Sequence, residues 1–122
     1  MDGQEYTIRI DTRYNRICIH RKTLKAIGDP LFIHLGYLSK TKELMVLGTW
    51  VDDRKSIRVR FDGSGSFFVV SKALIEGIRS VSGILKGNGS YLAVGKKAET
   101  IPAISFSLAE AVFLTGTEEA PL

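Results

Sequence analysis

The residues of this 122-residue chain best suited to chemistry are basic, and they gather in its first half. Residues 1–60 contain 12 basic against 7 acidic side chains, whereas residues 61–122 contain 5 against 6. A cluster of basic side chains binds phosphates by neutralising their charge and releasing counterions. The same imbalance is equally typical of an ordinary solvated surface. Charge alone therefore leaves both interpretations open.

The sequence contains no arrangement typical of a catalytic or metal site. Cys18, His20 and His34 lack the spacing of zinc ligands, and there is no second cysteine to complete a site or a disulfide. The acidic pairs Asp52–Asp53 and Glu118–Glu119 are adjacent rather than convergent, and residues 83–95 lack the spacing of a phosphate loop. We therefore expect a protein that is not an enzyme and uses no cofactor or metal.

Composition is that of a soluble globular domain, with 44% hydrophobic and 25% charged residues. No apolar run approaches the roughly 18 residues of a membrane helix. The first five residues are polar and acidic, unlike a signal peptide. A single cysteine fits a reducing compartment. We expect one compact cytoplasmic domain that has no contact with membranes.

The basic side chains need elements to position them, and hydrophobic spacing predicts strands and two helices. Gly28 and the following Asp29-Pro30 end the first helix, whereas Ser71 begins the second and Gly83 ends it. The strands follow from alternation of apolar and polar residues. Expected strands cover residues 6–10, 16–20, 32–37, 44–47, 56–61, 67–70, 90–94 and 101–108, with helices at 21–27 and 72–82.

The order of these elements repeats. Residues 7–10 align with residues 56–59 at a spacing of 49, and residues 17–24 align with residues 67–74 at a spacing of 50. This pattern predicts a first unit at 6–48, a connector at 49–55, a second unit at 56–114 and a flexible tail at 115–122.

We expect a mostly β fold of the α+β class, in which the two units pack as a single-chain pseudo-dimer. A unit of about fifty residues buries too little surface to close a core alone. Trp50, the only tryptophan, is expected to fill the space between the units, with stacking on a nucleic-acid base as the alternative.

The stretch from Asn15 to Gly28 reads N-R-I-C-I-H-R-K-T-L-K-A-I-G and is followed by a hairpin at residues 32–47. This stretch resembles the AbrB/SpoVT-like transition-state regulators, a bacterial family that includes MazE-type antitoxins. The resemblance covers residues 6–48 and more weakly the second unit. His20 departs from the family's usual proline, and Asn15 departs from its glycine. The resemblance implies an AbrB-like β-barrel of swapped hairpins.

The resemblance also implies a DNA-binding face. The matching positions are Arg9 and Arg16 on strands and Lys25 on the helix, and further basic side chains lie near them in the sequence. In the second unit only Arg58 and Lys72 stand at corresponding places, so the face is lopsided. The expected DNA-binding set is Arg9, Arg13, Arg16, Arg21, Lys22, Lys25 and Arg58.

Two functions remain open at this point. The first is a DNA-binding protein of transcription regulation that acts on double-stranded DNA, as a pseudo-dimeric monomer or a homodimer. The alternative is a protein-interaction module, antitoxin-like or accessory to a mobile element, whose basic face docks an acidic partner. The one-sided charge motivates the alternative.

Overall fold

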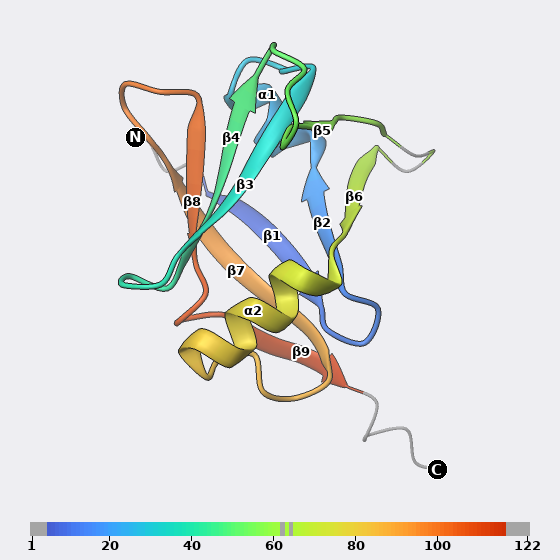
Figure 1. Ribbon diagram of the computed structural model, residues 1–122, viewed down its shortest axis with the longest axis vertical. Helices are drawn as coiled ribbons and strands as arrows, with labels where there is room; N and C mark the ends of the chain where they lie inside the picture. Colours follow the sequence, from blue (N-terminus) through green and yellow to red (C-terminus); the bar gives the residue numbers. More distant parts are fainter. Residues whose placement is uncertain (1–4, 62, 64, 117–122) are drawn as a thin grey trace.

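The computed structural model describes residues 5–61, 63 and 65–116. Within these residues the fold is mostly β, with two helices (Figure 1). In chain order the elements are β1 (Tyr6–Asp11), β2 (Arg16–His20), α1 (Arg21–Ala26), β3 (Phe32–Leu38), β4 (Glu43–Thr49), β5 (Ile57–Arg58), β6 (Ser66–Val70), α2 (Lys72–Ser82), β7 (Gly89–Lys97), β8 (Ala103–Ser107) and β9 (Val112–Gly116).

The strands form one antiparallel sheet in the order β5-β3-β4-β8-β7-β1-β2-β6. The last strand, β9, pairs with the first part of β7, and β8 pairs with the last part of β7. The sheet curls into a half-barrel, and the two helices lie toward opposite ends of it (Figure 1). Between the described residues of β5 and β6, the two ends of the strand order, no ladder is formed.

The core fills the inside of the curled sheet. Alternate residues of the strands point inward, as the period of two requires, and both helices add side chains to the same cluster. Each large apolar side chain that is fully buried contributes about 1.5–3 kcal/mol. The fully buried large side chains are Ile8, Ile10, Ile17, Ile19, Leu24, Ile33, Leu44, Ile75, Ile78, Ile104, Phe106 and Leu108.

Both helices end close to the predicted signals, and α2 also begins at its predicted cap. After α1 the chain turns through Gly28 at φ 91°, a conformation that favours glycine. The Oγ of Ser71 accepts a hydrogen bond from the Leu74 amide at 3.2 Å, and Gly83 closes α2 at φ 65°. Val81 is exposed, whereas Ile75 and Ile78 of the same helix are buried. Neither helix in the described part of the chain is long and apolar enough to cross a membrane.

The second half departs from the predicted strands. The strand expected at 56–61 is reduced to the two residues of β5, and the strand expected at 90–94 is longer, since β7 continues through residues 95–97. The sequence did not predict β9. Residues 62 and 64, between the strands expected at 56–61 and 67–70, and residues 117–122 of the expected tail lie outside the described residues.

Candidate nucleic-acid interface

The outer face of β7, β1, β2 and β6 carries the first group of predicted residues. Directly paired residues on antiparallel strands share a face. Arg9 is opposite Leu92 on one side and Cys18 on the other, and Cys18 is opposite Phe68. Because the neighbours of Arg9 along β1 point into the core, the Arg9 side chain is exposed outside the sheet.

Arg16 extends this face at the start of β2. It is exposed and lies opposite Val70 of β6. Its guanidinium carbon lies 4.9 Å from the centroid of the Phe68 ring and 5.6 Å from that of Tyr14. These distances are typical of cation–π contacts. The two rings therefore hold the Arg16 guanidinium on the surface of the sheet.

Arg13, also in the predicted set, pairs with a neighbouring carboxylate. Its Nε and Nη2 donate hydrogen bonds to the two carboxylate oxygens of Asp11, at 3.0 and 2.8 Å, and Nη2 also donates to Ser90 Oγ. The side-chain hydrogen bond from Arg13 holds the pKa of Asp11 below its usual value, although burial of the carboxyl opposes this. Arg13 thus neutralises a nearly buried carboxylate, and its guanidinium is held by the protein itself.

The basic residues of α1 lie beside the same face. Arg21, Lys22 and Lys25 are all exposed, and residues three or four apart share one side of a helix. The guanidinium of Arg21 lies 4.0 Å from the centroid of the Phe61 ring. Lys22 lies over Tyr6 at 5.8 Å. Arg21 and Lys22 line an open hollow of about 790 Å³ between α1 and the start of β1.

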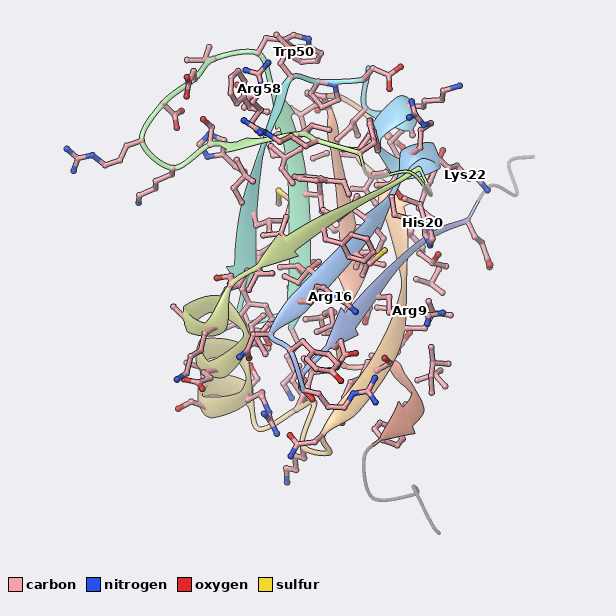
Figure 2. The ribbon with its side chains drawn as sticks, turned by 90° about the vertical axis from the view of Figure 1, so that its right-hand side faces the viewer. Arg9, Arg16, His20, Lys22, Trp50 and Arg58 are labelled. Carbon is pink, nitrogen blue, oxygen red and sulfur yellow. The ribbon has the colours of Figure 1, made fainter. Side chains whose placement is uncertain are left out.

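Figure 2 shows how the labelled basic residues are distributed. Arg9, Arg16 and Lys22 lie on the side of the molecule formed by β1, β2 and α1, and His20 lies with them. Arg58 lies apart, toward the end where Trp50 is found. Its guanidinium covers Phe32, whose strand partner Thr49 directly precedes Trp50. Figure 2 therefore places Arg58 away from Arg9, Arg16 and Lys22.

Trp50 does not fill a space between two units, contrary to the sequence-based expectation. Its side chain is 51% exposed, and its ring lies against Gly28, where an added Cβ would come within 3.3 Å of it. β4 ends at Thr49, and Trp50 follows the strand at the surface, whereas Gly48 within β4 faces inward against Pro30.

The acidic connector forms a turn, as expected for a solvated segment. Asp53 Oδ1 accepts hydrogen bonds from the amides of Lys55 and Ser56, and Oδ2 pairs with His34 Nε2 at 3.1 Å. Desolvation acts to raise the pKa of Asp53, but the hydrogen bond from the Lys55 amide and the nearby His34 outweigh it. The pKa of this carboxyl therefore lies below its usual value. No group of three metal-binding side chains occurs among residues 5–61, 63 and 65–116.

The sequence-based prediction omitted the aromatic and apolar part of this face. Residues 67–70 were expected to form an entirely apolar strand, but only Phe67 and Val69 are buried, and Phe68 and Val70 are exposed. The available signal was the basic partner strand: a strand that pairs with exposed Arg16 must present alternate residues to solvent.

Basic and aromatic side chains thus share the outer face of β1, β2 and β6, and the cations of α1 lie at its edge. Comparison of the chain with protein-family models, with curated proteins and with solved structures finds no match.

Proposed function

We propose that this protein binds nucleic acid through the basic face formed by β1, β2 and α1. The observation that carries the proposal is the convergence of Arg9 and Arg16, from neighbouring strands, with the exposed cations of α1. Such side chains bind phosphates without reading sequence. The binding set is Arg9, Arg16, Arg21, Lys22 and Lys25; Arg13 belongs to the support beneath it, and Arg58 lies outside it.

We further propose that the fold is a pseudo-dimer of the AbrB-like type, acting on DNA in regulation. The strand pairings support this. Exchanging β1 with β5, β2 with β6, β3 with β7 and β4 with β8 converts each observed ladder into another observed ladder or into itself, except for β1–β2 and β7–β9. A two-fold relation between the halves of the chain accounts for that exchange.

The registers support the same relation. Arg9 pairs with Leu92, and Arg58, at the corresponding place, pairs with Phe32. Gly36 pairs with Met45, just as Lys96 pairs with Ser105. Two of the ladders between halves map onto themselves in this exchange, and each is centred on a pair of corresponding residues. These pairs are Cys18–Phe68 between β2 and β6, and Met45–Ser105 between β4 and β8.

The proposed symmetry does not extend to the binding residues. Ser66 takes the place of Arg16 in the second half, and Arg58 takes the place of Arg9. An intact basic set therefore occurs once in the molecule. We expect one monomer to bind without requiring a palindromic site, because a symmetric half-site needs a second reading surface.

The test is fluorescence anisotropy of a labelled random-sequence duplex at salt concentrations between about 50 and 200 mM. We expect affinity to fall steeply with salt, and each phosphate contact that is removed to lower the salt slope by about 0.9. The variant in which Arg16→Ala is combined with Lys25→Ala should lose nearly all binding. Arg54→Ala, which removes an exposed arginine from the connector, is the matched control.

An outcome in which the double variant binds as tightly as the control would overturn the proposed site. A different result is that the native chain retains protein partners from a nuclease-treated lysate while the double variant loses them. That result would indicate an acidic protein ligand. Thermal unfolding of each variant, followed by circular dichroism, separates loss of binding from loss of the fold.

A further inference from the structure

We infer that the nucleic acid recognised by this face is single-stranded, with unpaired bases stacked on the rings of Phe68 and Tyr14. The inference rests on the proposed nucleic-acid function and specifies its substrate. A duplex offers its phosphates and groove edges, whereas an unpaired strand also offers the flat, apolar faces of its bases.

The outer face is too apolar for a surface that contacts only phosphates. Phe68 is 38% exposed, Val70 70% and Val94 47%, all on strands of this face. Arg9 belongs to a row of directly paired residues that crosses the strands, and this row ends at Val112 of β9, which lies opposite Leu92. Contiguous exposed apolar surface of this kind marks an interaction site. A ligand that covers it needs apolar faces of its own.

The aromatic side chains lie where a base and its phosphate would be bound together. Tyr14 is 61% exposed in the turn before β2, and the Arg16 guanidinium lies near both its ring and that of Phe68. Arginine stacks on rings and binds phosphate at the same time. Arg9 and Phe68 lie in the same row of paired residues, on strands two positions apart in the sheet. Their backbones are therefore roughly 10 Å apart. Rings and cations therefore alternate across the face.

Charge favours an anionic ligand over a second copy of this chain. Two copies packed through this face would bring their Arg9 and Arg16 side chains together. The carboxylate in the neighbouring row, Asp11, cannot offset them, because Arg13 already pairs with it. A polyanion with apolar faces satisfies both features of the surface, and single-stranded nucleic acid is the ligand class that combines them.

The experiment compares a labelled oligo(dT) strand with a duplex of the same length in anisotropy titrations of the full chain. We expect the single strand to bind at least about 10-fold more tightly, because stacking adds to the phosphate contacts that both ligands make. Phe68→Leu keeps the apolar bulk but removes the ring. It should weaken binding of the strand by about 5- to 150-fold, the range for one stacked base, and leave duplex binding within about two-fold.

Two further variants keep the test decisive. Tyr14 is exposed in the turn before β2, so Tyr14→Leu removes a ring that lies outside the core. It should weaken binding of the strand as Phe68→Leu does. Trp50→Leu removes a similarly exposed ring from the other end of the molecule and should leave binding unchanged.

Each other outcome overturns the inference. Equal affinity for strand and duplex, or an unaltered affinity in both the Phe68 and Tyr14 variants, removes the stacking role. If binding then still depends on Arg16, the proposed function survives. If neither ligand binds at low salt, both the proposed function and this inference are wrong. If Trp50→Leu weakens binding of the single strand as much as Phe68→Leu does, the stacking site lies elsewhere.

Discussion

Phe106 lies directly against the backbone of Gly95, its partner across the β7–β8 ladder. A Cβ added at Gly95 would come within 2.5 Å of the ring and 2.8 Å of the Ser105 carbonyl oxygen. Phe106 is fully buried, so the ring has no space into which it can move. The close approach that lets this large ring enter the core therefore depends on the absence of a side chain at Gly95.

Gly95→Ala should destabilise the protein by about 1–3 kcal/mol, the usual cost of overpacking a core. Gly36→Ala is the matched control, because Gly36 also lies within a strand, β3, and an added Cβ there meets nothing within 4 Å. That variant should stay within about 0.5 kcal/mol of the native protein. Urea unfolding gives both values, and equal stability of the two variants would contradict the packing argument.

Arg13→Ala should lower stability but have little effect on nucleic-acid affinity. The substitution leaves the Asp11 carboxylate, whose side chain is 9% exposed, without its charged hydrogen-bond donor. Hydrogen bonds to charged groups contribute about 1.5–3 kcal/mol. Arg16→Ala should show the reverse pattern. The two variants are compared by thermal unfolding and by anisotropy, and a large affinity loss in a folded Arg13 variant would return this residue to the binding set.

Stability should fall in acid because of the same pair. The pKa of Asp11 in the folded protein lies below its ordinary value of 3.8. The unfolded chain therefore binds this proton at a higher pH than the folded one. The stabilising contribution is complete above pH 3.8 and is lost as the pH falls through the folded pKa. Asp11→Asn should flatten this dependence in unfolding curves measured across the acid range. An unchanged slope would show that other carboxyls dominate it.

Two glycines of α2 should respond oppositely to alanine. Gly77 lies inside the helix, and an added Cβ there meets nothing within 4 Å, so Gly77→Ala should stabilise by about 0.5–1 kcal/mol. Gly83 holds φ 65° at the helix end. There alanine should destabilise by about 1 kcal/mol, because its Cβ disfavours that conformation. Denaturant midpoints of the two variants should therefore move in opposite directions.

Local chemistry located both helices from sequence, whereas strand pairing depended on distant residues. Gly28, Ser71 and Gly83 act within a few residues of the helix ends they define, so their effect is visible in the sequence. The partners of β1 are β2, which follows it closely, and β7, which lies about eighty residues further on. The alternation at 56–61 predicted a full strand, but β5 pairs with β3 through only Ile57 and Arg58.

The sequence predicted the basic residues of the candidate site but not the contacts of Arg13 or the exposed aromatic ring of Phe68. Sequence identified Arg9 and Arg16, since both alternate with buried isoleucines and must face outward. It did not reveal that Arg13 would bind Asp11, although the two-residue spacing within a turn was a usable signal. The exposure of Phe68 follows only from its place opposite Cys18 on the outer face.

The strand order has a consequence for how the chain can be divided. Residues before Trp50 supply β1–β4, those after it supply β5–β9, and along the sheet the strands of one half are interleaved with those of the other. Neither half retains an uninterrupted sheet. Cleavage within the exposed segment 51–55 should yield two fragments that are unfolded separately but reconstitute the fold by complementation when mixed, as circular dichroism would detect. Synthesis of β8 near the end of the chain would then be needed before β4 gains its second neighbour in the sheet.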